Sequence, residues 1–192
     1  MVLKVKSIVI ICAVFFFFSF FMQARVRLED NKLKLTDIVS NEKSILLDCE
    51  LNKVSNDEIE GKFVGIYFSA AWCGPCKEFT PLLHKFYEKN KSDLEIIWVS
   101  LDRDTKLPPG NADKYHLSLK KKYIESSNMN WLTTDTTYYE GARLHKKTGN
   151  RGVPRLVFFT PTGKYITNLG YYEVRDNFEI FKDWKNTIWF TP

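Results

Sequence analysis

The sequence predicts an α/β protein with a central mixed sheet flanked by helices. Two apolar runs, at 63–68 and 94–101, have the length and the β-branched and aromatic composition of buried strands. Each run is followed by a helical pattern, and this alternation favours parallel pairing of the strands. Two later runs, at 156–160 and 164–169, flank the turn residues Pro161-Thr162-Gly163 and predict an antiparallel hairpin.

The first two dozen residues differ in character from the rest of the chain. Lys4 and Lys6 precede an apolar block at 8–22, which is short for a membrane span. This arrangement predicts a signal peptide over residues 1–24, and the alternative is an uncleaved membrane anchor formed by residues 8–22. The expected localisation is the secretory pathway, either the endoplasmic reticulum lumen or the cell exterior, or an organelle reached through that route. Membrane contact is expected only through this segment.

Residues 25–60 are expected to form an N-terminal extension with a first short element, and residues 61–190 the main domain. The run Ile45-Leu46-Leu47 suggests a strand in the extension, and the polar stretch at 52–61 predicts a loop that enters the main domain. The formal net charge of +5 is mild, and acidic residues occur throughout the chain. We therefore expect no nucleic-acid partner.

The elements between and after the strands follow from helical spacing and from residues that break helices. The Pro-Pro-Gly run at 108–110 predicts a loop. A helix is expected over 112–125, and its lysine run at 120–122 predicts a solvated helix face rather than a targeting or anion-binding patch. A loop through Trp131-Leu132 leads to a helix over 139–147. A last amphipathic helix carries four apolar residues at helical spacing: Val174, Phe178, Phe181 and Trp184.

Two cysteines, Cys73 and Cys76, lie where the pattern changes from strand to helix. Apolar residues recur after them at helical spacing: Phe79, Leu82, Leu83, Phe86 and Tyr87. We therefore expect Cys73 at the N-terminus of a helix, where the helix dipole and unpaired N–H groups stabilise a thiolate. This position predicts thiol–disulfide chemistry.

The segment Trp72-Cys73-Gly74-Pro75-Cys76-Lys77 resembles the active-site motif of thioredoxins. Pro81 stands where thioredoxins kink the active-site helix, and Arg151-Gly152-Val153-Pro154 resembles the segment that carries their cis-proline. The resemblance covers most of residues 62–170 and implies a thioredoxin-like fold. It implies a protein-disulfide reductase whose redox group is the Cys73–Cys76 disulfide, with no further cofactor. The implied partners are protein disulfide substrates and an upstream dithiol or reductase that donates electrons.

Several segments resemble the tryparedoxin and nucleoredoxin branch of this family more than thioredoxin itself. They are the segment Tyr-Phe-Ser-Ala-Ala-Trp-Cys at 67–73, the triplet Phe79-Thr80-Pro81 and the pair Trp131-Leu132. Tyr67 stands where thioredoxins bury an aspartate, and Gly74 stands where tryparedoxins carry proline. The chain thus resembles a nucleoredoxin-like body with a thioredoxin-type redox loop.

Thiol–disulfide exchange needs one thiolate that attacks and a second thiol that resolves the mixed disulfide. Cys73 is expected to attack, because it is nearer the helix N-terminus, and Cys76, one helical turn deeper, is expected to resolve. Gly74 and Pro75 set the geometry between them. Trp72 is expected to shield the thiolate and contact substrate, and its alternative role is core packing.

A cis peptide is expected at Val153-Pro154, facing the cysteines, with the Val153 backbone free to pair with a bound polypeptide. Because Tyr67 replaces the buried aspartate, Cys76 needs another proton acceptor. Asp102, at the carboxyl end of the second strand, is the candidate. The alternative is that Asp102 is a solvated loop carboxylate.

A Cys-x-x-Cys pair can also be half of a zinc site, which needs two further ligands. His84, His116 and His145 are scattered along the chain, so no metal is expected. Cys49 is expected to be a buried small apolar residue, with a regulatory or intermolecular disulfide as the alternative. The alternative function is a client-binding or chaperone module that uses the thioredoxin surface.

Overall fold

A computed structural model describes residues 33–39, 46–103, 112–149 and 152–189. These residues fall within one compact unit, Leu33–Pro192. The predicted signal peptide at 1–24 and the predicted loop at 108–110 lie outside the described residues. Within the described ranges, no helix is long and apolar enough to cross a membrane.

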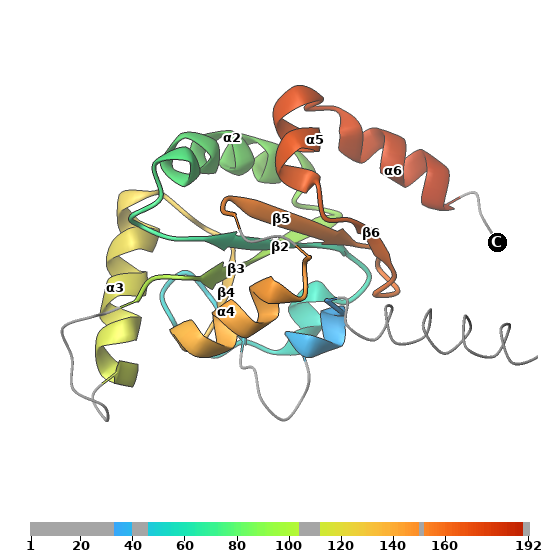
Figure 1. Ribbon diagram of the computed structural model, residues 1–192. Helices are drawn as coiled ribbons and strands as arrows, with labels where there is room; N and C mark the ends of the chain where they lie inside the picture. Colours follow the sequence, from blue (N-terminus) through green and yellow to red (C-terminus); the bar gives the residue numbers. More distant parts are fainter. Residues whose placement is uncertain (1–32, 40–45, 104–111, 150–151, 190–192) are drawn as a thin grey trace, which may run out of the picture. The chain divides into compact units, whose positions relative to one another are not determined.

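The central sheet has six strands in the order β1-β4-β3-β2-β5-β6. β2 pairs in parallel with β3, and β3 with β4, whereas the β1–β4, β2–β5 and β5–β6 pairs are antiparallel. The predicted mixed sheet flanked by helices is confirmed (Figure 1). The strands are β1 (Leu46–Leu47), β2 (Phe63–Ser69), β3 (Leu94–Ser100), β4 (Leu132–Thr134), β5 (Arg155–Phe159) and β6 (Tyr165–Thr167).

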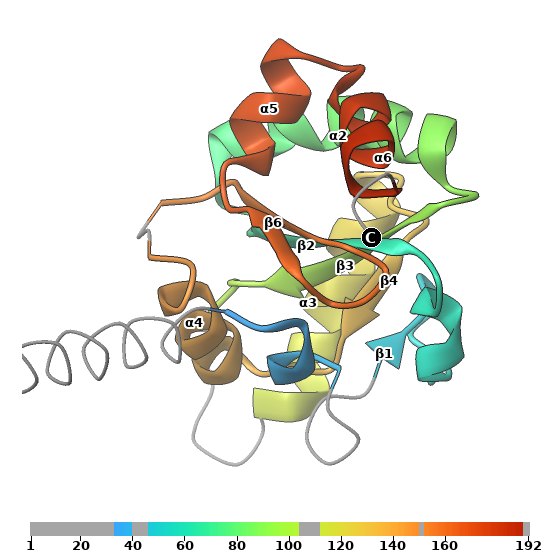
Figure 2. The ribbon, with the colours of Figure 1, turned by 90° about the vertical axis from the view of Figure 1, so that its right-hand side faces the viewer.

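Helices cover both faces of this sheet. Figures 1 and 2 show α2, α5 and α6 over one face and α4 over the other, with α3 beside the sheet. Two short 3-10 helices precede β2. The helices are η1 (Leu35–Asp37), η2 (Asn56–Ile59), α2 (Gly74–Asn90), α3 (Ala112–Ser126), α4 (Tyr138–Lys146), α5 (Gly170–Asp176) and α6 (Ile180–Trp189).

β2 and β3 are buried along their whole length, as their continuous apolar runs predict. Successive side chains of a strand point to opposite faces of the sheet. Tyr67 therefore joins the core beneath α2, while Phe68 joins the core on the α4 side. Both faces of the central strands are thus filled with apolar side chains, and their carboxyl ends meet at one edge, where the two cysteines follow β2.

Two predicted elements differ from the structure. The expected loop through Trp131-Leu132 contains strand β4, because Leu132 and Thr133 pair with β3 and the Thr133 hydroxyl donates to the Trp98 carbonyl. The expected last helix is two helices, α5 and α6. Asn177 ends α5 in an extended conformation, and its carbonyl accepts from the Ile180 N–H where α6 begins. Pairing with β3 therefore makes a strand where the sequence pattern predicts a loop. The break at Asn177 divides the helical pattern into two helices.

Candidate active site

The redox loop ends in the first turn of α2. Cys73 is the N-cap of this helix, and its sulfur accepts a hydrogen bond from the Cys76 N–H at 3.2 Å. Pro75 lies in the first turn, where a proline costs no intrahelical hydrogen bond. The structure confirms the prediction that Cys73 lies at a helix N-terminus, next to N–H groups that stabilise a thiolate.

Cys73 and Cys76 form a disulfide, with 5.2 Å between their Cα atoms. Cys73 retains 4% exposure and Cys76 none, so Cys73 is the sulfur nearer to solvent. This order of exposure agrees with attack by Cys73 and resolution by Cys76. Cys49 has a free thiol, and it is half-buried against the core beneath α2.

The segment opposite the cysteines comes from a distant part of the chain. The Val153–Pro154 peptide bond is cis. The Cys73 sulfur lies 3.7 Å from the Val153 carbonyl oxygen, across 80 residues of sequence. The next residue, Arg155, is buried, and its guanidinium donates to the Asn168 carbonyl. The structure thus brings together the two segments that sequence reasoning paired.

Trp72 is 66% exposed, which rules out the core-packing alternative. It projects from the turn that precedes the attacking cysteine. Leu169 and Tyr172, at the start of α5, are also exposed, at 50% and 48%. Of these residues, Trp72 directly precedes the attacking cysteine, and a large amphipathic ring there can contact a bound substrate.

Tyr67, which replaces the aspartate of thioredoxins, is fully buried beneath α2. Its hydroxyl is 3.0 Å from the Thr80 Oγ1 and donates to the Cys76 carbonyl at 3.5 Å. Burial raises the pKa of Tyr67 far above its usual value, so the phenol stays neutral. Tyr67 therefore ties the redox helix to β2 through neutral hydrogen bonds to Thr80 and Cys76, without a buried charge.

Asp102 is 8% exposed, so it is not a solvated loop carboxylate. Its Oδ1 accepts from the Ala71 N–H at 2.8 Å, and its Oδ2 accepts from the Ser100 hydroxyl at 2.9 Å. Burial raises the pKa of Asp102, opposed in part by these two hydrogen bonds. Asp102 thus ties the redox loop to the end of β3. Its proton exchange with Cys76 remains a prediction.

Sequence reasoning missed Lys120, for which the prediction of a solvated face is wrong. Lys120 is 1% exposed, and its ammonium donates to the carbonyls of Thr134 and Thr136, the latter at 3.1 Å. Burial lowers the pKa of Lys120 from 10.5 to about 8. A signal for this burial in the sequence is the apolar residue Ile124, four positions later and so on the same face of the helix, which is also buried. Lys121 and Lys122 are exposed, as predicted.

The histidines whose side chains are described serve separate contacts. His145 lies with its Nε2 3.1 Å from the Gly152 carbonyl oxygen, next to the Val153–Pro154 segment. The ring of His84 packs 6.2 Å from that of Trp131. No group of three potential metal ligands gathers anywhere in the described part of the chain.

A family model described as thioredoxin-like matches residues 61–165, more than half of the chain. The chain belongs to this thioredoxin-like family. Bovine nucleoredoxin (Bos taurus) is 35% identical over 133 residues, which is 67% of this chain and 27% of that protein. A probable nucleoredoxin 1 of Arabidopsis thaliana is 35% identical over 126 residues. The chain therefore spans between about a fifth and a quarter of the length of these nucleoredoxins.

Solved structures show the same relationship. Tryparedoxin I from Leishmania major superimposes with a TM-score of 0.58 at 28% identity, covering 71% of this chain and 87% of that one. Thioredoxin from Wuchereria bancrofti gives 0.58 at 26% identity, covering 80% and 99%. The predicted resemblance to the nucleoredoxin and tryparedoxin branch is confirmed, and with it a redox function of the thioredoxin family.

The predicted secretory localisation is wrong on these comparisons. The nucleoredoxin relatives are proteins of the cytoplasm and nucleus, not of the secretory pathway. The prediction rested only on the length and apolar composition of one segment, which match those of a signal peptide. That block, residues 8–22, lies outside the described residues.

Proposed function

We propose that this protein reduces protein disulfides through the Cys73–Cys76 pair. The observation that carries the proposal is the disulfide at the N-terminus of α2, whose outer sulfur lies 3.7 Å from the Val153 carbonyl. A sulfur at a helix N-terminus becomes a stabilised thiolate when the disulfide is reduced. The Cys76 N–H, which already points at this sulfur, stabilises that charge directly.

The reaction has two exchange steps. The Cys73 thiolate attacks one sulfur of a substrate disulfide, which forms a Cys73–substrate disulfide and releases the other substrate sulfur as a thiolate. Cys76 then loses its proton and attacks the Cys73 sulfur. This step forms the Cys73–Cys76 disulfide and releases the second substrate sulfur. The substrate gains two electrons, which an upstream dithiol or reductase returns to the protein.

The surroundings of Cys73 suit a polypeptide substrate. The Val153 backbone lies beside the reacting sulfur and offers main-chain groups for strand-like pairing. Trp72 adds a large exposed apolar surface on the redox-loop side. Gly74 and Pro75 hold the two cysteines within one helical turn. These contacts support assignment of Trp72, Gly74, Pro75, Val153 and Pro154 to the substrate-facing site.

Insulin reduction with dithiothreitol as electron donor tests the proposal. The wild type should accelerate precipitation of the insulin B chain, and Cys73→Ser should fall to the uncatalysed rate because it lacks the attacking thiolate. Cys49→Ser is the matched control and should keep full activity, because Cys49 is a free thiol outside the site. An inactive wild type, or full activity of Cys73→Ser, would contradict the proposal.

The exposed apolar residues favour a second candidate, a client-binding module. Trp72, Leu169 and Tyr172 are all at least 48% exposed. A binding module would suppress aggregation of an unfolded client without using its cysteines. Retention of that suppression by a Cys73→Ser/Cys76→Ser variant, with no insulin reduction by the wild type, would select this function instead.

A further inference from the structure

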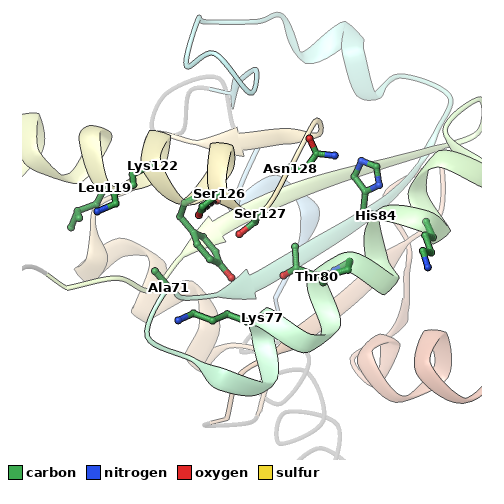
Figure 3. Close-up of a pocket in the computed structure, with 12 residues that line it drawn as sticks. Ala71, Lys77, Thr80, His84, Leu119, Lys122, Ser126, Ser127 and Asn128 are labelled. Carbon is green, nitrogen blue, oxygen red and sulfur yellow. Dashed lines mark hydrogen bonds between the residues drawn. The ribbon is translucent and has the colours of Figure 1, made fainter.

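A cavity of about 830 Å³ lies between α2 and α3 and reaches the redox loop. Ala71, two residues before Cys73, and Lys77, the residue after Cys76, both line it. Figure 3 shows Lys77, Thr80 and His84 rising from α2, with Lys122 and Ser126 across from them on α3. Residues on both sides of the cysteine pair therefore line the cavity, so a polypeptide bound to Cys73 can extend into it.

The lining carries positive charge and no carboxylate. Lys77, Lys85 and Lys122 line the cavity together with His84, and neither aspartate nor glutamate is among the lining residues. These three lysines make no salt bridge with any described residue, whereas Lys89 and Lys121 on the same two helices are paired with Glu179 and Glu50. The cavity therefore concentrates unneutralised cations, which attract an anionic ligand.

Polar groups inside the cavity add hydrogen-bonding capacity. Tyr123 lines it, is only 4% exposed, and its hydroxyl has no hydrogen-bond partner among the described residues. A buried hydroxyl without a partner is unfavourable, and a ligand oxygen would satisfy it. Thr80 also lines the cavity and donates to the Cys76 carbonyl. A bound ligand would thus touch Thr80, the residue of the redox helix that is hydrogen-bonded to Tyr67 on β2.

We propose that this cavity binds carboxylate side chains of the substrate and so selects protein disulfides flanked by aspartate and glutamate. The inference rests on the proposed function and names its substrate class. Lysine ammonium groups steer and hold carboxylates, and the apolar walls formed by Leu119 and Pro81 pack against the intervening substrate backbone. Specificity arises because a lysine-flanked disulfide would place like charges in the same cavity.

Binding is measured with the full chain and a fluorescein-labelled, cysteine-free peptide rich in glutamate. Lys85→Gln/Lys122→Gln removes two cavity charges and should weaken binding about fivefold, as expected for two exposed ion pairs. Lys89→Gln/Lys121→Gln is the matched control, because it removes the same charge from the same helices outside the cavity. It should bind like the wild type. Equal affinity of the two variants would overturn the proposal.

A kinetic measurement separates this proposal from the proposed function. Two disulfide peptides are compared that differ only in glutamate or lysine beside the cysteines. The wild type should reduce the glutamate peptide with the lower KM, and the cavity variant should lose that preference about fivefold while keeping kcat. If the wild type reduces neither peptide, the proposed function fails, and the binding measurement still decides the cavity's ligand. Equal KM values for both peptides would overturn the acidic specificity.

Discussion

At the scale of single residues, the site depends on how buried polar groups near the cysteines are satisfied. Tyr67 is neutral and hydrogen-bonded to Thr80, so it cannot take a proton from Cys76 at ordinary pH. Asp102 is buried and ionisable, and it binds the N–H of Ala71, two residues before Cys73. Asp102 therefore positions the redox loop, whereas proton transfer from Cys76 to Asp102 stays a prediction, and one variant separates the two roles.

Asp102→Asn keeps an oxygen for the Ala71 N–H but removes the ionisable group. If Asp102 accepts the Cys76 proton, insulin reduction should slow by at least about tenfold. The wild-type rate should also rise with pH through a pKa above the ordinary aspartate value of 3.8, because burial raises the pKa of Asp102, and the variant should lack this rise. A pH profile shared by both proteins would leave Asp102 with positioning alone.

Lys120 makes stability depend on pH in the alkaline range. Its pKa is about 8 in the folded protein and ordinarily 10.5, so between these values the unfolded chain holds the proton and the folded chain does not. The free energy of unfolding should therefore rise as pH increases from 8 to 10.5, by up to about 3 kcal/mol. Urea titrations should show this rise in the wild type and not in Lys120→Met.

Lys121→Met is the control for this measurement, because Lys121 is exposed and lies next to Lys120 in the same helix. It should retain the wild-type pH dependence. If Lys120→Met also retained it, Lys120 would not be the group that causes the pH dependence.

At the scale of elements, the site depends on how closely helices approach the sheet edge. α4 packs against the end of β3, and it precedes the segment that carries Val153–Pro154. Thr137 and Glu140 form a capping box that fixes where α4 begins. Gly141 follows at the point of closest approach to Ser100. A small residue is required there, because a longer one would push α4 away from the strand.

Gly141→Ala should destabilise the protein. The alanine Cβ would lie 2.9 Å from the Ser100 carbonyl oxygen and 3.2 Å from the Val99 Cγ1. The Ser100 carbonyl belongs to the backbone at the end of β3 and cannot easily move away from the new methyl group. We expect a loss of about 1–3 kcal/mol in the free energy of unfolding. Gly74→Ala, in the first turn of α2, is the matched control because, outside its own chain neighbours and helix backbone, no atom lies within 4 Å of the place that the new methyl group would take. Thermal unfolding of the two variants should differ clearly, and a shared Tm would contradict the packing argument.

At the scale of the whole molecule, residues before β2 complete the core. Leu33, Ile38 and Leu46 are at most 2% exposed and pack in the cluster on the α4 side of the sheet. The Leu33 N–H donates to the Lys147 carbonyl, and Lys147 pairs with Asp37 at 2.6 Å. β1 covers the edge of β4. The predicted domain of residues 61–190 therefore excludes residues that the described core contains.

A chain that begins at Gly61 should be much less stable than one that begins at Leu33. The shorter chain loses five buried aliphatic side chains and the strand that covers β4, which should cost at least about 3 kcal/mol. Urea unfolding of the two purified chains measures the difference. Equal stability would show that residues 33–60 are dispensable and would support a domain boundary at residue 61.

Local sequence determined the central strands and the redox helix. Continuous apolar runs specify β2 and β3 because both faces of those strands are buried. The spacing after Cys76 specifies α2 because one face must meet the sheet. Cys73 at the helix start follows from the junction of these two patterns alone. The position of the reacting cysteine could therefore be predicted from neighbouring residues, because their spacing shows which segment forms the strand and which forms the helix.

Tertiary structure alone decided the rest. β4 exists because β3 pairs with it, and Lys120 is buried because the carbonyls of Thr134 and Thr136 lie where its ammonium reaches. The lysine-lined cavity arises because α2 and α3 meet across it. These features join residues that are far apart in the chain or on different elements. Periodicity reports which face of one element is buried, and only the packed fold determines what that face meets.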